Sequence, residues 1–531
     1  MNLNQEGCSL VYHLNFRGKD FHYYFIRSYG FTFVKNGSVS GGERMKRNHT
    51  MMQFFEWHLE ADGSHWDRLK NAASKLKDIG IDCVWLPPVT KGQSVGDNGY
   101  GIYDGYDLGE FDQKGTVRTK YGTKDELLQA IATCHNYGLC VYIDLVMNHK
   151  AGADGTEKFE VIEVNPDNRM EDISEPFEME GWTKFDFPGR KNKYSDFKWN
   201  HTHFNGTDYD AENDKMGVYR ITGENKHWNQ HVIDEFGNYD YLMFANIDYS
   251  LPEVRQEMIS WGKWMVDTLK CDGFRLDAVK HIDYEFINEF LQELIPYTKE
   301  HFFMVGEFWK ADVKACQTYL EQTNHDLNLF DVSLHYKFHE ASKAGTDFDL
   351  STIFDDTLVK TNPAQAVTFV DNHDSQPHES LESWVKDWFK PSAYALTLLR
   401  LCGYPCVFYG DYYGIGGPSP VPGKKDILDR LLYARYEKAY GEQTDYFDDP
   451  NTIGWVRHGV EELEGSGCAV IISNGDHNSE KKMFVGEHRA GEIWSDLTCH
   501  RDDHITIEED GFATFPVHGK SVSVWALNKP L

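Results

Sequence analysis

The chain has 531 residues, of which 40% are hydrophobic and 26% charged, an ordinary composition for a globular protein of two or three domains. Asp and Glu (84) outnumber Lys and Arg (53), and the formal net charge of −31 makes nucleic acid and acidic membrane surfaces poor partners. No apolar run of about 18 residues predicts a transmembrane helix, and the N-terminal sequence lacks a signal-peptide pattern, so a cytoplasmic protein is expected.

From about residue 50 the sequence alternates short apolar runs with longer amphipathic ones. Strand–helix alternation repeated eight times predicts an α/β fold, a (β/α)8 TIM barrel, rather than an open doubly wound sheet. No GxGxxG motif follows the first run, which disfavours a dinucleotide-binding domain. The eight predicted strands are MMQFFEW (51–57), CVWLPP (83–88), CVYIDLV (140–146), GFRLDA (273–278), FFMVGEF (302–308), LFDVSL (329–334), AVTFV (366–370) and CVFYGD (406–411).

Two segments do not follow this alternation. Residues 149–251 are polar and rich in Gly, Asn, Asp and Trp, and they are too long for a structureless loop, so an inserted subdomain after the third strand is expected. From residue 442 to 531 short apolar runs recur between turns, which predicts a small antiparallel β-domain. The barrel is therefore expected in two parts, 45–148 and 252–441.

Residues 1–44 show no clear amphipathic pattern. In the junction GGERM (41–45), codons for Gly-Glu-Arg can form a purine-rich ribosome-binding sequence in a bacterial gene. Met45 is therefore predicted as the translation start, and residues 1–44 as an extension that is not translated.

Polar side chains concentrate where the predicted strands end, which is where the active sites of such barrels form. Taken alone, each has a plain structural explanation, such as an ion pair, a helix cap or packing. Their coincidence at one rim indicates a functional site. The residues are Asp144, Asn148, His149, Arg275, Asp277, Lys280, His281, Glu307, Asp371, His373 and Asp374, with Tyr103 in the loop after the second strand.

The stretch GFRLDAVKH (273–281) places Arg275 and Asp277 on one face of a strand, because side chains alternate along it. Glu307 ends the next strand, about 4.8 Å away, which is compatible with the roughly 5–5.5 Å between the carboxyl groups of retaining glycoside hydrolases. Arg275 would keep Asp277 ionised, as a nucleophile requires. Burial beside Phe308 and Trp309 would keep Glu307 protonated, as a general acid requires.

Four motifs resemble the ordered signature regions of the α-amylase family of retaining glycoside hydrolases: DLVMNH (144–149), GFRLDAVKH (273–281), GEFW (306–309) and FVDNHD (369–374). The likeness runs from about Thr50 to the end of the chain. It is strongest to the bacterial liquefying type and its cytoplasmic branch.

The resemblance implies a role for each matching residue. Asp277 matches the nucleophile, Glu307 the acid/base, and Asp374 the third acid, which grips sugar hydroxyls. The segment 149–251 matches domain B, one wall of the cleft, and the segment from 442 matches a C-terminal β-sandwich. The expected substrate-binding residues are Arg275 beside the nucleophile, His149 and His373 around the central sugar, Tyr103 as its stacking platform, Lys280 and His281 on the reducing-end side, and Trp309.

The resemblance also implies a calcium ion that ties domain B to the barrel, through Asn148, Asp240, Asn246 and the backbone carbonyl of His281. This sequence departs from the family, because Asn246 stands where the family has Asp. Ser250 replaces a further Asp of the liquefying enzymes. Since ligand charge tunes calcium affinity, one weak site is expected rather than a cluster.

The main hypothesis is an endo-acting, retaining hydrolase of internal α-1,4-glucosidic bonds in starch, glycogen and maltodextrins, working as a monomer on an α-glucan. A transglycosylase, a debranching enzyme or an exo-acting maltodextrin hydrolase of the same family remains open. A non-catalytic glucan-binding barrel is disfavoured because Asp277, Glu307 and Asp374 are all present. An aldolase-like barrel is disfavoured because FYGDYYG is a poor phosphate cradle.

Overall fold

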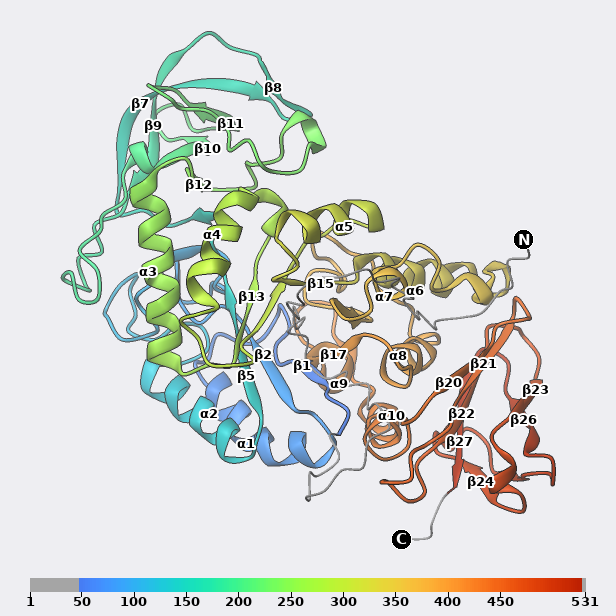
Figure 1. Ribbon diagram of the computed structural model, residues 1–531. Helices are drawn as coiled ribbons and strands as arrows, with labels where there is room; N and C mark the ends of the chain where they lie inside the picture. The colour runs from blue at the N-terminus through green and yellow to red at the C-terminus, as the bar shows by residue number, and fades with distance from the viewer. Residues whose placement is uncertain (1–46, 528–531) are drawn as a thin grey trace, which may run out of the picture. The chain divides into compact units, whose positions relative to one another are not determined.

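Eight parallel strands close into a barrel in the computed structural model, which describes residues 47–527 (Figure 1). Around the ring they follow the order β1-β17-β16-β15-β14-β13-β5-β2, so the first strand pairs with the last. The predicted barrel is confirmed, whereas the prediction for residues 1–44 lies outside the described part of the chain. The barrel strands are β1 (Met51–Gln53), β2 (Cys83–Leu86), β5 (Cys140–Leu145), β13 (Gly273–Leu276), β14 (Phe303–Gly306), β15 (Asn328–Phe330), β16 (Ala366–Phe369) and β17 (Tyr404–Phe408).

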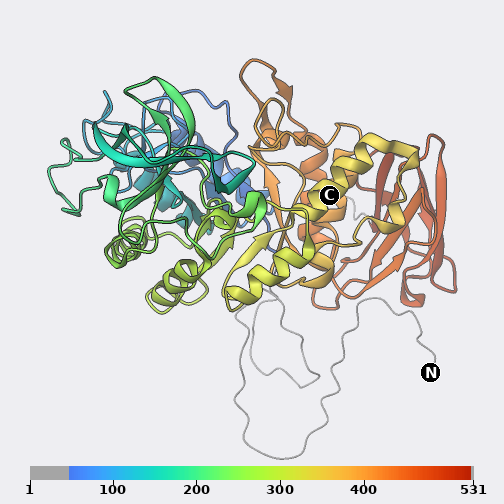
Figure 2. The same ribbon diagram turned by 90° about the horizontal axis from the view of Figure 1, so that it is seen from above.

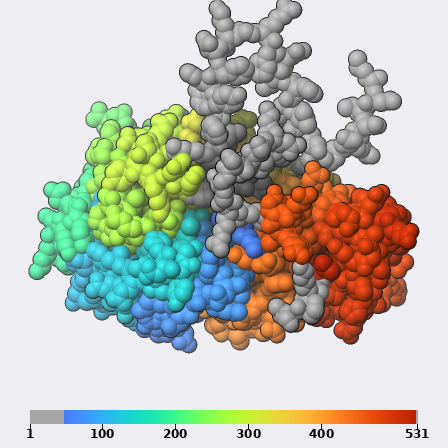
Figure 3. Space-filling view, turned by 60° about the horizontal axis from the view of Figure 1, so that its bottom comes forward, coloured from blue at the N-terminus to red at the C-terminus, as the bar shows by residue number. Residues whose placement is uncertain are grey.

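Helices follow most barrel strands, as the amphipathic runs predict. At the start of α2, Thr123 Oγ1 accepts from the Glu126 N–H at 3.4 Å and Glu126 Oε2 accepts from the Thr123 N–H at 2.8 Å, a capping box. The blue and cyan residues of α1 and α2 lie side by side on the face shown in Figure 3. The helices are α1 (His65–Asp78), α2 (Lys124–Asn136), α3 (Pro252–Leu269), α4 (Tyr284–Leu294), α5 (Val313–Gln322), α6 (Val332–Ala344), α7 (Leu358–Thr361), α8 (Lys390–Leu398), α9 (Tyr409–Tyr413) and α10 (Lys425–Glu437).

The sixth apolar run is only partly a strand. β15 ends at Phe330, and α6 begins two residues later. Asp331 Oδ1 accepts from the backbone N–H of Leu334 at 3.0 Å, and so it caps a helix within the predicted strand. The apolar residues of LFDVSL therefore divide between a strand and the first turn of a helix.

The segment after β5 forms a sheet of its own, whose teal and green strands lie together in Figures 1 and 2. β12 pairs with β6, which directly follows the third barrel strand, so both ends of the insertion meet beside the barrel. The boundaries 149–251, 252–441 and 442–531 stay predictions. The strands are β6 (His149–Lys150), β7 (Gly155–Asn165), β8 (Asn168–Asp172), β9 (Phe177–Lys184), β10 (Phe204–Asp210), β11 (Lys215–Ile221) and β12 (Ala245–Ile247).

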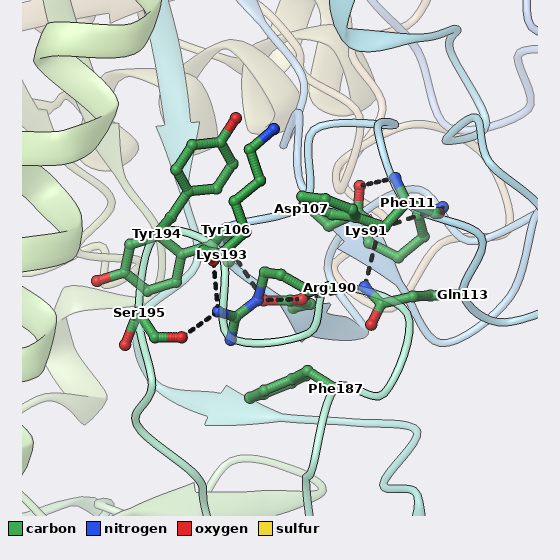
Figure 4. A network of polar contacts seen from close by, with 12 residues as sticks. Lys91, Tyr106, Asp107, Phe111, Gln113, Phe187, Arg190, Lys193, Tyr194 and Ser195 are labelled. Carbon is green, nitrogen blue, oxygen red and sulfur yellow. Dashed lines mark hydrogen bonds and ion pairs between the residues drawn. The ribbon is translucent and has the colours of Figure 1, made fainter.

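A buried network of charges joins the loop after β2 to this insertion (Figure 4). Arg190 Nε donates to Asp104 Oδ2 at 2.9 Å, and Gln113 Nε2 donates to the same oxygen at 3.0 Å. Gln113 Nε2 also reaches Asp107 Oδ2 at 2.9 Å, and that carboxylate pairs with Lys91 Nζ at 3.4 Å. Because buried charges are tolerated only when they are paired, this network fixes the loop against the insertion.

The C-terminal strands form two antiparallel sheets, β20-β21-β22-β27-β24-β25 and β23-β26, which share one apolar core. Trp494 and Trp525 from the larger sheet and Phe515 from the smaller lie in that core. The strands are β20 (Gln443–Tyr446), β21 (Thr452–Arg457), β22 (Cys468–Ser473), β23 (Ser479–Phe484), β24 (Ile493–Asp496), β25 (His504–Thr506), β26 (Phe512–Val517) and β27 (Ser521–Leu527).

The described chain divides into two compact units, one of residues 47–344 with 352–436 and one of residues 345–351 with 437 onward. Four short strands complete the first unit: β3 (Lys91–Gly92), β4 (Ile102–Asp104), β18 (Gly414–Ile415) and β19 (Val421–Pro422). Between residues 47 and 527, no helix has the length and apolar character that a membrane crossing needs.

Candidate active site

A cavity of about 200 Å³ lies at the C-terminal ends of the barrel strands. Asp277, Glu307 and Asp374 reach it from the ends of β13, β14 and β16, as the sequence predicts. The inserted segment contributes part of the wall. The residues around the cavity are Trp57, Tyr100, His149, Tyr239, Leu242, Met243, Asp277, Ala278, Lys280, His281, Glu307, Trp309, Asp374, Ser380 and Leu381.

Arg275 is buried and binds three carboxylates at once. Its Nη1 donates to Asp144 Oδ1 at 2.8 Å and to Asp277 Oδ1 at 2.5 Å, and its Nη2 pairs with Glu307 Oε2 at 2.9 Å. Ala278 adopts a left-handed backbone conformation with φ 49°, and its N–H donates to the same Glu307 oxygen at 2.9 Å. One guanidinium therefore holds Asp277 and Glu307 next to each other.

Burial raises the pKa of all three acids of the cavity. The Arg275 charge opposes this rise at Asp277, as expected from the sequence, but burial is the larger effect. At Glu307 the Asp277 charge adds to burial, and at Asp374 burial and the Glu307 charge hold the pKa well above its usual range. Acids crowded in this way favour keeping a proton among them, which is what a general acid requires at neutral pH.

Three aromatic rings stack beside these acids. The centroids of Tyr100 and His373 are 5.1 Å apart at 11°, and those of Trp57 and Tyr100 are 5.8 Å apart at 11°. Gln53 Nε2 donates to His373 Nδ1 at 2.9 Å, so the ring proton is on Nε2, which faces Asp374 Oδ2 at 3.3 Å. Burial holds the pKa of His373 well below its usual value, so the ring is neutral.

Tyr103 does not reach the cavity, which corrects the expected stacking platform. Its hydroxyl donates to Asp154 Oδ1 at 2.7 Å, and its ring packs on Phe187 at 5.2 Å, both within the insertion. Tyr100, three residues earlier, lines the cavity, and its hydroxyl donates to Asp144 at 2.9 Å. The loop is rich in tyrosines, and sequence spacing alone does not show which of them faces the cavity.

His149 and His281 line the cavity with fixed ring orientations. His149 Nε2 donates to the carbonyl of Tyr100 at 2.8 Å, and His281 Nδ1 donates to the carbonyl of Tyr239 at 2.8 Å. Burial lowers the pKa of His149 to about 4 and that of His281 to about 3. Both rings are therefore neutral hydrogen-bonding groups near pH 7.

Lys280 and Trp309, both expected at the site, also contact each other. Lys280 Nζ donates to the Trp309 carbonyl at 3.1 Å and pairs with Glu235 Oε2 at 3.1 Å. Sequence reasoning missed Trp57 and Tyr239. Trp57 is the last residue of the first predicted strand, so the rule used for the acids would have found it, whereas no comparable signal identified Tyr239 in the insertion.

The side chains expected to bind calcium lie close together, but their oxygen atoms already accept hydrogen bonds from neighbouring asparagine amides. Asp240 is the one carboxylate among them, and it accepts from Asn229 Nδ2 at 2.8 Å and from Asn205 Nδ2 at 2.7 Å. Asn148 Nδ2 donates to Asn246 Oδ1 at 3.2 Å, which occupies a second expected ligand atom. Calcium takes six to eight oxygen ligands. The residues as arranged present N–H groups to the carboxylate and do not fit the ion.

One trio of acidic and histidine side chains in the range 47–527 has the spacing of a metal site: His231, Asp283 and Glu285. His231 Nδ1 is 3.2 Å from Asp283 Oδ2 and 3.5 Å from Glu285 Oε2. Asp283 Oδ1 accepts from two backbone N–H groups at the start of α4, so this carboxylate already has a role as a helix cap.

Comparison with known proteins gives a consistent result. A family model described as the α-amylase catalytic domain matches residues 60–454. The chain is 52% identical over 501 residues to a glucan 1,4-α-maltohexaosidase of Bacillus sp. (strain 707), which covers 94% of this chain and 96% of that protein. It is 44% identical over 498 residues to a cytoplasmic α-amylase of Escherichia coli (strain K12), covering 91% and 99% of the two chains.

Solved structures resemble the fold at low sequence identity. An α-amylase from Geobacillus thermoleovorans in complex with acarbose has a TM-score of 0.61 and 18% identity, covering 91% of this chain and 99% of that one. An α-amylase from Malbranchea cinnamomea has a TM-score of 0.59 and 15% identity, covering 91% and 96%.

Proposed function

Because this chain belongs to the α-amylase family and is a glycoside hydrolase acting on α-1,4-glucans, we propose that it cleaves internal bonds of these glucans with retention at the anomeric carbon. The observation that carries the proposal is the group of three carboxyl groups at one cavity, two of them held by Arg275. Retaining glycosidases need two carboxyl groups that lie close together on either side of the reacting bond.

In the proposed mechanism, Asp277 attacks the anomeric carbon while Glu307 gives its proton to the departing glycosidic oxygen. This breaks the C–O bond and leaves a covalent glycosyl ester on Asp277. Glu307, now ionised, removes a proton from water, and the resulting hydroxide displaces Asp277 from the sugar. The enzyme returns to its starting protonation state, and the two inversions give net retention.

The contacts of Glu307 indicate which of its oxygens carries the proton. Oε2 accepts from the Ala278 N–H and from Arg275 Nη2, both at 2.9 Å. An oxygen with two donors is a poor site for a proton, so the proton belongs on Oε1. Both donors also stabilise the carboxylate that forms once the proton has left.

The remaining residues of the cavity are proposed to bind sugar. Tyr100 offers a ring face for stacking, His149 and His281 offer neutral ring nitrogens, and Asp374 with the His373 Nε2–H offers a paired acceptor and donor for hydroxyl groups. Neutral donors suit an uncharged substrate because they need no compensating charge when water leaves.

The test uses a maltoheptaoside blocked at its non-reducing end, with products and their first-formed anomer followed by NMR. We expect internal cleavage giving α-anomers. Asp277→Asn should lower kcat by at least about a thousandfold, because removing a catalytic nucleophile costs several powers of ten. Asp502→Asn, at an exposed aspartate outside the barrel, is the matched control and should leave kcat unchanged.

Two outcomes would contradict the proposal. Turnover of the free oligosaccharide but not of the blocked one would indicate exo-acting hydrolysis. Exo-acting hydrolysis is the second candidate function, because one relative is named a maltohexaosidase. Initial β-anomers would exclude retention.

Three further expectations belong to this proposal. A cytoplasmic location is supported by the similarity to the cytoplasmic α-amylase of Escherichia coli. The protein is expected to act as a monomer on an α-glucan and to bind neither nucleic acid nor a membrane. Calcium is at most a weak, dispensable ligand, because the side chains expected to bind it already engage one another.

A further inference from the structure

A buried carboxylate lies where the insertion meets the barrel, and its oxygens are already matched by protein hydrogens. Asp240 is 1% exposed. Its Oδ2 accepts from Asn205 Nδ2 at 2.7 Å and from the Asn229 backbone N–H at 2.9 Å, and its Oδ1 accepts from Asn229 Nδ2 at 2.8 Å. A cation at this carboxylate would have to displace these donors and leave buried N–H groups without partners.

The amides continue from this carboxylate to the barrel. Asn246 Nδ2, on β12, donates to Asn205 Oδ1, on β10, at 2.8 Å. Asn148 follows β5 of the barrel, and its Nδ2 donates to Asn246 Oδ1 at 3.2 Å. All three asparagines are buried. The chain of hydrogen bonds therefore runs from the third barrel strand through two strands of the insertion to Asp240.

A lysine ammonium occupies an oxygen cage in the same region. Lys226 Nζ donates to the carbonyl of Thr202 at 2.6 Å, to the carbonyl of Phe204 at 3.1 Å and to Asp248 Oδ2 at 2.5 Å. Asp248 is buried and lies just beyond β12. Two carbonyls and a carboxylate around a compact positive charge are the kind of oxygen ligands that a bound metal cation uses.

We propose that Lys226 and the asparagine amides stabilise the buried carboxylates in place of a divalent cation, and that the native state of this protein needs no calcium. The lysine supplies the positive charge through a covalent tether, and the amides supply hydrogens to the buried carboxylate. The proposal concerns the attachment of the insertion and does not depend on the proposed cleavage pattern.

The first test compares the full-length protein after chelation with EDTA and in millimolar calcium chloride. We expect melting temperatures that agree within about 1 °C, because only an ion that binds the native state raises its stability. Elemental analysis of the desalted protein should find calcium well below one ion per chain. A melting temperature that falls by many degrees in EDTA, or calcium retained at one ion per chain, overturns the proposal.

The second test removes the tethered charge. Lys226→Met should lower the melting temperature markedly, since it leaves Asp248 buried without its cation. Lys215→Met is the matched control in the insertion, because Lys215 lies on β11, is 56% exposed and pairs with Glu163 at the surface. Equal small shifts for both variants would contradict a structural role for Lys226.

The third test converts the site into one that needs a metal, and it stays informative if Lys226→Met does not fold. Asn205→Asp together with Asn229→Asp places carboxylates beside Asp240 and removes its amide donors. The double variant should melt earlier than the wild type in EDTA and regain stability when calcium is added. If it is as stable as the wild type in EDTA, the amides are not what compensates Asp240, and the proposal fails.

Discussion

The guanidinium of Arg275 is shared among three carboxylates, and its positive charge partly offsets the rise in their pKa values that burial causes. A cation paired with Asp277 alone would keep that carboxylate strongly ionised, but the Arg275 guanidinium also forms ion pairs with Asp144 and Glu307. The pKa of Asp144 is raised to about 7 by burial and by the Asp277 charge. Arg275 therefore makes the pKa of Asp277 lower than burial alone would, and it fixes the distance between Asp277 and Glu307.

The stacking role of Tyr100 can be separated from that of Tyr103 by truncation. Tyr100→Ala should lower kcat/KM roughly thirtyfold, because truncating a buried aromatic contact costs about 2 kcal/mol. Tyr103→Ala should lower the melting temperature but leave kcat/KM nearly unchanged, since its ring packs inside the insertion. Both are measured on maltoheptaose at a temperature where each variant is folded. A larger kinetic loss for Tyr103→Ala would return the platform to that position.

His335 should make stability depend on pH. It is fully buried, its Nδ1 donates to the carbonyl of Val370 at 2.6 Å, and burial lowers its pKa to about 3. The unfolded chain takes up a proton near pH 6.5 and the native state does not, so stability is complete above that pH and is lost as the pH falls toward 3. The loss is at most about 1.4 kcal/mol per pH unit.

Urea unfolding of the wild type and of His335→Asn between pH 4 and 6 checks this. The asparagine can keep the hydrogen bond to the Val370 carbonyl but cannot titrate. The free energy of unfolding of the variant should therefore change less steeply with pH than that of the wild type, by up to about 1.4 kcal/mol per pH unit. Parallel curves would show that His335 carries no such linkage.

The acids and histidines that follow strands were predictable from the sequence, because strand ends are fixed points of a barrel. Asp277, Glu307 and Asp374 needed only the strand assignment. Tyr100 and Tyr239 lie in loops, where no periodicity relates position to direction. The calcium expectation rested on residue identity, whereas the amide orientations that argue against the ion depend on contacts between distant segments.

Among the elements, α2 depends on its capping box. Thr123→Ala should reduce the free energy of unfolding by about 0.5–2 kcal/mol, because it leaves an N–H of the first turn without its acceptor. Thr133→Ala is the control on the same helix, where the Thr133 hydroxyl bonds back to the carbonyl of Gln129 at 2.8 Å and is exposed. It should change stability by less than about 0.5 kcal/mol. Chemical denaturation measures both, and equal losses would contradict the assignment.

The strands of the barrel were predictable because parallel strands are buried on both faces and appear as short apolar runs. The run LFDVSL shows the limit of that signal. Apolar periodicity over six residues does not distinguish a strand from a helix start, and here the decision came from the Asp331 cap. In the insertion, strands such as β7 and β9 alternate buried and exposed residues, many of them charged, so they lack an apolar run.

For the molecule as a whole, a net charge of −31 implies self-repulsion that dissolved salt reduces. Raising sodium chloride from about 10 to 100 mM shortens the screening length from about 30 to 10 Å. The melting temperature should therefore rise over this range. Choline chloride at the same ionic strength should give the same rise, and an effect confined to sodium would indicate specific binding instead.

The pairing of β1 with β17 means that the ring is completed by the two strands farthest apart in the chain. During synthesis, Met51 leaves the ribosome long before its neighbour Cys406 exists. At about 5–20 residues per second, the roughly 350 intervening residues take tens of seconds. Throughout that time the nascent chain carries an unpaired strand edge, the kind of surface that aggregates or recruits chaperones. We therefore expect the yield of this protein in a cell to depend on translation speed, even though the finished barrel has no open edge.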